Sequence, residues 1–221
     1  MFSAAGLKPD EKLHKLFLKG SKHTFRKGDM VMEGDTKHAF MIESGFIRAY
    51  NVNNRGDKFT HIIYAAYDMF PAYRVFDEDP HMHYEALGTT TLYALPRATL
   101  AQAVRTDLQI CHSLLRVTTS QSRVFSARVR NLEFRHAPER VIYRLILMAE
   151  RFGEQQPDGS YFIGVPMSQP VLASTINASR ESVSRTMETL KNEGLISYDS
   201  KHIVVRDLAA LKSRLNTIAK Q

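Results

Sequence analysis

The stretch SQPVLASTINASRESVSRTMETLKNEGLIS, residues 168–197, decides the fold. It contains two apolar patterns with helical spacing, and a serine that can cap a helix N-terminus precedes each of them. Asn177 suits the turn between them, because asparagine tolerates the left-handed backbone conformation. The pattern therefore predicts a helix that begins after Ser168, a tight turn, and a second helix that begins after Ser179 and ends near Glu193.

The second predicted helix has an apolar face and a polar face. At roughly 100° per residue, Val183, Met187 and Leu190 lie on one side and should face the core. The polar residues on the outward side, close to the helix N-terminus, are Arg180, Glu181, Ser184 and Arg185. Arginine donates two hydrogen bonds to guanine, glutamate accepts one from cytosine, and serine bonds a base or a phosphate. We therefore expect these four side chains to read DNA bases; an ordinary amphipathic helix with a salt-bridged surface is the alternative.

A hairpin is predicted after the second helix, around residues 198–202. Lys201 lies in its turn, and Ser168 and Ser179 lie at two helix N-termini, where backbone N–H groups attract anions. These three residues are expected to contact DNA phosphates. The sequence thus predicts a winged helix-turn-helix DNA-binding domain over residues 137–221.

A long helix is predicted over residues 106–136, because hydrophobic positions recur there at steps of three and four. The stripe consists of Leu108, Cys111, Leu115, Phe125, Val129 and Leu132, and the polar pair Thr118 and Ser122 interrupts it in the middle. Thr106 followed by Gln109 is similar to a capping box at the helix start. Two copies of this helix can bury the stripe against each other, which predicts a homodimer. Packing of the helix on its own domain is the alternative.

Short strands separated by glycine-containing turns fill residues 25–100, with a short helix before them over 8–19. This pattern predicts a small antiparallel barrel or sandwich, which we assign to residues 1–105. The expected fold class is therefore α+β, with an N-terminal antiparallel β-barrel of the jelly-roll kind, a long dimerisation helix and a C-terminal winged helix-turn-helix.

This order of elements resembles the Crp/Fnr family of bacterial transcription regulators. The segment SRESVSRTMETLKNEGLIS (179–197) is similar to the family's S-R-E-x-V-S-R recognition helix and the L-x-x-x-G-L-I that follows it, and NLEFRHAPERV (131–141) and FRKGDMVMEGD (25–35) extend the resemblance. It implies a cytoplasmic homodimer that binds an inverted repeat in double-stranded DNA and contacts RNA polymerase, and that is not an enzyme. Arg180 resembles the cyclic-AMP receptor branch. Because Glu181, Ser184 and Arg185 also satisfy the E-x-x-S-R pattern of the fumarate-nitrate branch, the half-site stays open.

The resemblance also shows what the predicted sensor domain lacks. Members that bind cyclic AMP carry a glycine-glutamate pair and an arginine-serine pair, whereas this chain has Phe70-Pro71 and His83-Tyr84 at about those places. A cyclic phosphate needs a cation and backbone donors, and only Arg74 is nearby. We therefore expect no conventional cyclic-AMP binding, and the effector stays unknown. The candidate effector region comprises Thr118, Ser122, Arg74, His83 and Tyr84.

Histidines in the same segment raise the question of a metal or haem. His81, His83 and Glu85 would share one face of a strand, which is acceptable geometry for a divalent metal, and Met82 with a histidine could ligate haem. We favour a surface strand with titratable side chains and expect no cofactor and no metal. A haem- or metal-dependent sensor is the alternative. A cupin-like metalloenzyme is less favoured, because the glutamate follows the H-x-H pattern too closely.

Composition limits the remaining classes. The chain has 221 residues, a formal net charge of +7 and one cysteine. A single cysteine forms no internal disulfide and no cysteine cluster, and it fits the reducing cytoplasm. The sequence shows neither a signal-peptide pattern nor an apolar run of membrane-spanning length, so we expect no membrane partner and no export.

Overall fold

The computed structural model describes residues 10–31, 37–72, 82–134, 136–199 and 202–218. The chain divides into two compact units, and the division falls at Ser126, inside the longest helix. We call the unit before this point the sensor unit and the unit after it the DNA-binding unit. Among the described residues, no helix is long and apolar enough to cross a membrane.

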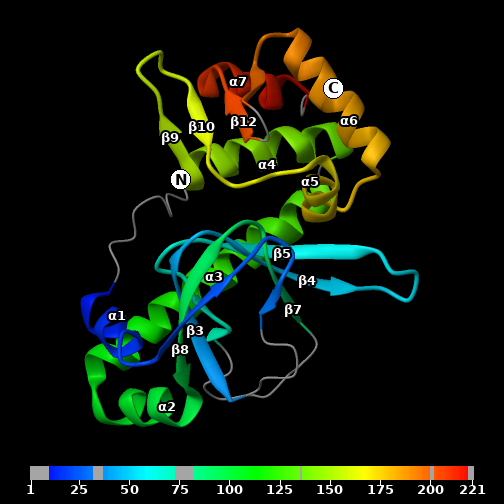
Figure 1. Cartoon of the computed structure of the whole chain (residues 1–221). Coiled ribbons are helices and arrows are strands. Elements are labelled where there is room, and N and C mark those ends of the chain that lie inside the picture. Colours follow the sequence, from blue (N-terminus) through cyan, green and yellow to red (C-terminus); the bar gives the residue numbers. More distant parts are fainter. Residues whose placement is uncertain (1–9, 32–36, 73–81, 135, 200–201, 219–221) are drawn as a thin grey trace. The chain divides into compact units, whose positions relative to one another are not determined.

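The sensor unit contains two four-stranded antiparallel sheets (Figure 1). One sheet has the strand order β1-β8-β3-β6, and the other has the order β2-β7-β4-β5. The strands are β1 (Ser21–Phe25), β2 (Met30–Val31), β3 (His38–Ser44), β4 (Ile47–Val52), β5 (Lys58–Tyr64), β6 (Met69–Phe70), β7 (His83–Ala86) and β8 (Thr90–Pro96). The α+β class and the jelly-roll-like domain are confirmed. The domain is not a closed barrel, because among the described strands none pairs with a strand of the other sheet.

Aromatic rings fill the space between the two sheets. Phe40, Tyr64, Phe70 and Tyr84 belong to one buried cluster that receives side chains from both sheets. The ring of Phe70 stacks on those of Phe40, Tyr64 and Tyr84, with centroids 5.6, 5.2 and 5.2 Å apart. Phe70 is completely buried. The interior of the sensor unit is therefore a packed core.

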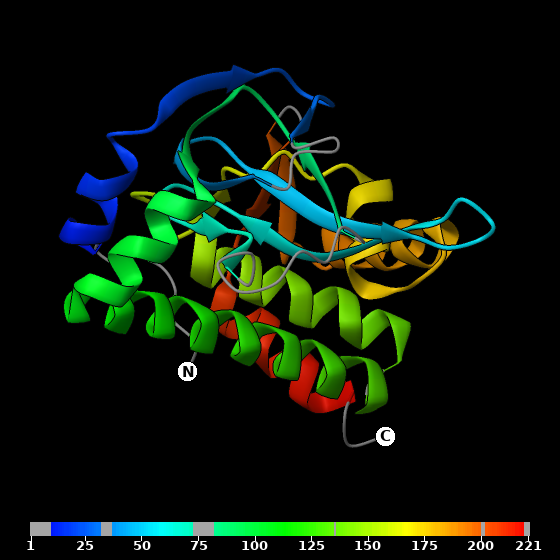
Figure 2. The ribbon, with the colours of Figure 1, turned by 90° about the horizontal axis from the view of Figure 1, so that it is seen from below.

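Three helices pack on one side of the sensor sheets: α1 (Glu11–Phe17), α2 (Arg97–Thr106) and the first part of α3 (Leu108–Phe134). They share a second core that includes Phe17, Leu100 and Leu114. Figure 2 shows α3 as one long helix. Helices α2 and α3 follow each other directly along the chain.

The expected capping box at the start of α3 is wrong. Thr106 is the last residue of α2, and its hydroxyl donates to the carbonyl of Gln102. Asp107 caps α3 instead, because its Oδ1 accepts from the backbone N–H groups of Gln109 (2.9 Å) and Ile110 (3.4 Å). An aspartate one residue after a possible threonine cap is the better acceptor for the N-terminal N–H groups of a helix.

The DNA-binding unit is built around α4 (Ala137–Phe152), whose buried face includes Val141, Leu145 and Ala149. Three helices pack against it: α5 (Gln169–Ile176), α6 (Arg180–Asn192) and α7 (Leu208–Ile218). The remaining strands are β9 (Gly153–Gln155), β10 (Tyr161–Ile163), β11 (Ile196–Asp199) and β12 (His202–Val205), in a sheet of order β11-β12-β10-β9. Helices α5 and α6, followed by the β11–β12 hairpin, form the expected winged helix-turn-helix.

Candidate nucleic-acid interface

The first helix of the motif begins and ends as the sequence predicts. The hydroxyl of Ser168 accepts a hydrogen bond from the backbone N–H of Val171, at 3.4 Å, and so caps α5. Asn177 follows the helix with a φ of 51°, in the left-handed region. The backbone reversal at Asn177 then directs the chain into the start of α6.

Arg140 holds this turn in place, and the sequence analysis did not identify Arg140 as a site residue. Its Nη2 donates to the carbonyl of Asn177 at 3.3 Å, which ties α4 to the turn between α5 and α6. The start of α4 is itself fixed, because the backbone N–H of His136 donates to Glu139 Oε2 at 2.7 Å. The sequence gives one indication of this contact. Arg140 lies in the first turn of a helix against which the two helices of the motif must pack.

Helix α6 presents the expected reading face. The hydroxyl of Ser179 accepts from the backbone N–H of Ser182 at 3.1 Å and caps the helix. Val183, Met187 and Leu190 are all at most 1% exposed, so they hold the inner face in the core. The four outward side chains, Arg180, Glu181, Ser184 and Arg185, are all exposed.

The charge of Glu181 is favoured by its position at the helix N-terminus. Its own backbone N–H and the Ser179 hydroxyl donate hydrogen bonds that lower the pKa of the carboxyl, and Arg180 lowers it further. The side chain is therefore a carboxylate at neutral pH, which can only accept hydrogen bonds. The arginines beside it can only donate. The outward face of α6 thus offers both hydrogen-bond donors and a hydrogen-bond acceptor within two helical turns.

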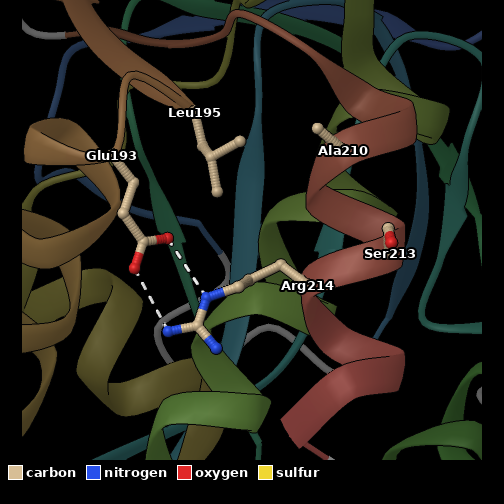
Figure 3. A pocket seen from close by; sticks show the side chains of 5 residues that line it. All are labelled: Glu193, Leu195, Ala210, Ser213 and Arg214. Carbon is tan, nitrogen blue, oxygen red and sulfur yellow. Dashed lines mark hydrogen bonds and ion pairs between the residues drawn. The ribbon is translucent and has the colours of Figure 1, made fainter.

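The far end of α6 is held by an ion pair. The two guanidinium nitrogens Nε and Nη2 of Arg214, on α7, each donate to the carboxylate of Glu193 at 3.1 Å (Figure 3). The pair lies in a shallow hollow lined also by Leu195, Ala210 and Ser213. Both ends of α6 are therefore anchored, so its outward face has a defined orientation within the unit.

The hairpin that follows α6 contacts the start of α5. The Tyr198 side chain, on β11, is 44% exposed and hydrogen-bonds to Gln169, while partial burial raises the pKa of its hydroxyl. Arg206 Nε donates to Ser197 Oγ at 2.9 Å and braces the hairpin. Lys201, the predicted phosphate contact in this hairpin, lies outside the described residues. Tyr198 and Gln169 were not among the predicted site residues.

Two family patterns match this chain. The pattern described as "Cyclic nucleotide-binding domain" matches residues 22–107, and the pattern described as "Crp-like helix-turn-helix domain" matches residues 139–214. The second match covers α5 and α6 with their exposed face. The chain belongs to the Crp/Fnr family of transcription regulators. This family consists of DNA-binding regulators and not of enzymes.

Several relatives support this membership. A "CRP-like cAMP-activated global transcriptional regulator" of Mycobacterium tuberculosis is 28% identical over 149 residues, which span 66% of each protein. "Electron transport regulator A" of Shewanella oneidensis is 22% identical over 84% of this chain and 75% of that protein. The structure of FixK2 from Bradyrhizobium japonicum shares the fold, with a TM-score of 0.78, 20% identity, and coverage of 88% of this chain and 96% of that one.

In this Crp/Fnr chain, half of the apolar members of the predicted stripe on α3 are exposed within the single chain. Leu108 is 88% exposed, Leu115 59% and Val129 50%. The remaining apolar members, Cys111, Phe125 and Leu132, are partly buried. A different face of α3, which includes Ile110, Leu114 and Ala127, is buried. The helix therefore packs within its own chain with one face and still has a second apolar face to offer.

The candidate effector residues of the Crp/Fnr sensor unit that the structure describes do not form one site. Tyr84 is buried between the sheets, whereas its neighbour His83 is exposed on the opposite face of β7. The hydroxyl of Thr118 donates to carbonyls of its own helix, at Leu114 and Leu115. Ser122 is exposed, and Arg74 lies outside the described residues.

The metal-like pattern on β7 is engaged in structural contacts. His83 stacks on Tyr50, with ring centroids 5.3 Å apart. Both carboxylate oxygens of Glu85 accept from Arg48 Nη2, at 2.9 and 2.8 Å, and one also accepts from Lys58 at 3.1 Å. In the part of the chain that the structure describes, no three His, Cys, Asp or Glu side chains are placed to hold a metal ion. His81 lies outside that part.

Proposed function

We propose that this Crp/Fnr regulator acts in the cytoplasm as a homodimer that binds an inverted-repeat operator through two copies of α6. The observation that carries the proposal is the outward face of α6, where Arg180, Glu181, Ser184 and Arg185 are all exposed at the end of a helix anchored on both sides. In helix-turn-helix proteins the N-terminal residues of the second helix reach the base edges in the major groove.

Base reading and phosphate binding are assigned to different residues. Arg180 and Arg185 can each donate two hydrogen bonds to guanine O6 and N7, and Glu181 can accept from cytosine N4. We therefore expect at least one G·C pair in each half-site. Ser168, Ser179 and Lys201 are proposed to contact phosphates and so to fix the position of the helix.

The uncovered stripe on α3 supports dimerisation. Leu108, Leu115 and Val129 expose apolar surface that a second copy of the helix would bury. A parallel pair of helices gives a two-fold axis, and this axis would place the two α6 helices on equivalent half-sites. An inverted repeat in the operator follows from that symmetry.

We also propose that cyclic AMP does not control this protein. The stacked rings of Phe40, Tyr64, Phe70 and Tyr84 occupy the interior of the sensor sheets, and Tyr84 is only 2% exposed. A ligand in that space would have to displace these rings and lose their packing.

Fluorescence anisotropy tests the proposal. Purified, ligand-free protein is titrated onto a duplex with a TGTGA-type inverted repeat and onto a scrambled duplex, at ~150 mM salt to suppress non-specific phosphate binding. We expect selective binding to the repeat, unchanged by added cyclic AMP. Selectivity that appears only with cyclic AMP would contradict the effector proposal. If neither duplex binds, selection from random sequences either finds another inverted repeat, which supports the proposal, or finds none, which refutes it.

A further inference from the structure

The guanidinium of Arg140 lies beside the turn of the helix-turn-helix motif, and most of its hydrogen-bonding capacity is unused. The side chain belongs to the first turn of α4 and is partly exposed. Its Nη2 donates to the Asn177 carbonyl at 3.3 Å, and among the described residues this is its one acceptor. Nε is buried without a partner there, whereas Nη1 is neither buried nor hydrogen-bonded within the described residues. An arginine has five N–H donors, so the terminal end of this one can still donate.

The described part of the chain supplies no counter-ion for this cation. The acidic neighbour in the sequence, Glu139, is only 4% exposed, and its carboxylate accepts the backbone N–H of His136 at 2.7 Å. Within the described residues no ion pair joins Arg140 to a carboxylate. The Asn177 carbonyl is an acceptor, but it carries no net charge. A partly buried cation is stabilised by a nearby anion, so the site favours an anion from outside the chain.

The place of Arg140 in the motif indicates which anion this is. Asn177 is two residues before Ser179, which caps α6, so Arg140 is tied to the segment that leads into the proposed reading helix. The N-terminus of α6 carries the positive end of the helix dipole, and a cation at the preceding turn strengthens the same field. When the first residues of α6 reach base edges in the major groove, the motif also lies against the adjoining sugar-phosphate backbone. A phosphodiester is therefore the anion within reach.

We propose that Arg140 binds a DNA phosphate beside each half-site while the Asn177 carbonyl orients its guanidinium. Because Nε is buried, the contact uses the terminal nitrogens: Nη1 donates to a phosphate oxygen, and Nη2 keeps its bond to the carbonyl. The inference rests on the proposed DNA binding by α6 and adds a cation to the expected phosphate contacts. A side chain held in place before DNA arrives loses less conformational entropy on binding. Such a contact fixes the position of α6 on the duplex.

The variant Arg140→Gln tests the contact by removing the charge. Anisotropy titrations over a range of salt concentrations use the inverted repeat that the wild type binds and a scrambled duplex. We expect affinity to fall about tenfold or more on both duplexes, since a dimer loses two charge-assisted hydrogen bonds. The slope of log affinity against log salt should become shallower by about two, roughly 0.9 for each lost phosphate contact. The control Arg105→Gln removes the same charge from an exposed position of α2 and should leave the slope unchanged.

Arg140→Lys separates phosphate binding from support of the turn. Lysine keeps the positive charge but lacks the planar fork of arginine. We expect this variant to keep the wild-type salt slope to within about half a unit. If Arg140 only supported the turn, Arg140→Gln would lose preference for the repeat over the scrambled duplex and keep the wild-type slope, and this result would overturn the proposal. Circular dichroism verifies that each variant is folded. If Arg140→Gln does not fold, Arg140→Met takes its place, because methionine keeps an unbranched apolar stem without the charge.

Duplexes in which one phosphate at a time is replaced by a neutral methylphosphonate locate the contact. We expect one position in each half-site at which this replacement weakens the wild type about tenfold and leaves the uncharged Arg140 variant unchanged, since the partner of that phosphate is already gone. A wild type that binds no inverted repeat, even after selection from random sequences, would refute the proposed function itself. A wild type that binds one, with an uncharged Arg140 variant that keeps its salt slope and its full response to every neutral linkage, would overturn only the Arg140 contact.

Discussion

The charged cluster on the sensor sheets and the charged face of α6 contain the same kinds of residue in opposite circumstances. In the sensor unit, the side chains of Arg48 and Glu85 are only 8% and 14% exposed, and Glu85 accepts hydrogen bonds from both Arg48 and Lys58. On α6, Arg180, Glu181 and Arg185 are exposed, and Glu181 feels the charge of Arg180 without being buried by it. Charges that satisfy each other inside the chain stabilise the fold. Charges that a helix holds exposed to solvent remain accessible to a ligand.

The interiors of the two units add to the comparison. The sensor sheets enclose stacked aromatic rings that form a packed core. The DNA-binding unit has a buried core as well, but it also carries the exposed polar face of α6. The residues proposed to contact DNA all belong to the DNA-binding unit.

The largest expected effect comes from opening the sensor core. Phe70→Ala removes a completely buried ring that stacks on three others, so we expect a loss of about 3 to 5 kcal/mol in the free energy of unfolding. Chemical denaturation measures it, with Val52→Ala as a control on the exposed part of β4. A loss below about 1 kcal/mol would show that the core is loosely packed and that the interior could admit a ligand.

The next effect concerns Glu85. Burial alone would raise the pKa of its carboxyl, but hydrogen bonds from Arg48 and Lys58 outweigh burial and lower the pKa below the ordinary value of 4.5. Glu85→Gln removes the charge and should cost about 1.5 to 3 kcal/mol of stability at pH 7. Because the pKa is lower in the folded state, this contribution is complete above the ordinary carboxyl pKa and is lost as the pH falls through the lowered value.

Denaturation of wild type and Glu85→Gln at several pH values checks this expectation. The difference in stability should be constant near neutral pH and should shrink below about pH 4.5. A difference that grows in acid would have the wrong sign and would contradict the ion pair. If Glu85→Gln were as stable as wild type at pH 7, the Arg48–Glu85–Lys58 cluster would contribute as little to stability as an exposed salt bridge does.

Substitutions on the outward face of α6 should change DNA affinity and leave the free energy of unfolding unchanged. Glu181→Ala or Arg185→Ala should each cost on the order of 1 to 3 kcal/mol at the cognate base pair, because a hydrogen bond to a base edge is lost. Anisotropy on cognate and scrambled duplexes measures the effect. The matched control is Glu188→Ala, an exposed glutamate further along α6. Equal losses on both duplexes would refute base reading.

The order of elements, the two serine caps, the left-handed Asn177 and the inner face of α6 could all be predicted from the sequence. Each of these features is local, since caps, turns and helical periodicity depend on residues a few positions apart. The resemblance to the family's recognition-helix motif added the expectation that the outward side chains of α6 read DNA bases. The assignment of Arg180, Glu181 and Arg185 to bases stays a prediction.

The features that sequence reasoning missed depend on contacts between distant residues. Arg140 and Asn177, whose carbonyl it binds, are 37 positions apart in the sequence, and so are Arg48 and Glu85. The second contact gives Glu85 of the His-x-His-x-Glu spacing a structural role, because its carboxylate accepts hydrogen bonds from two cations, Arg48 and Lys58. The cap of α3 was misplaced by one residue, because Thr106 and Asp107 both have side chains that can cap a helix.

The smallest of these effects links the fold of α6 to its reading face. Ser179→Ala removes the hydroxyl that accepts from the Ser182 N–H, and it should cost about 1 kcal/mol of stability, as N-cap losses typically do. The same hydroxyl also hydrogen-bonds to Glu181, so operator affinity should fall as well, because the carboxylate becomes less well held. Paired denaturation and anisotropy measurements separate the two effects. Ser179→Asp keeps a capping acceptor but adds a negative charge beside the DNA; it should restore stability while weakening binding to every duplex, and equal recovery of both would exclude a phosphate contact at this position.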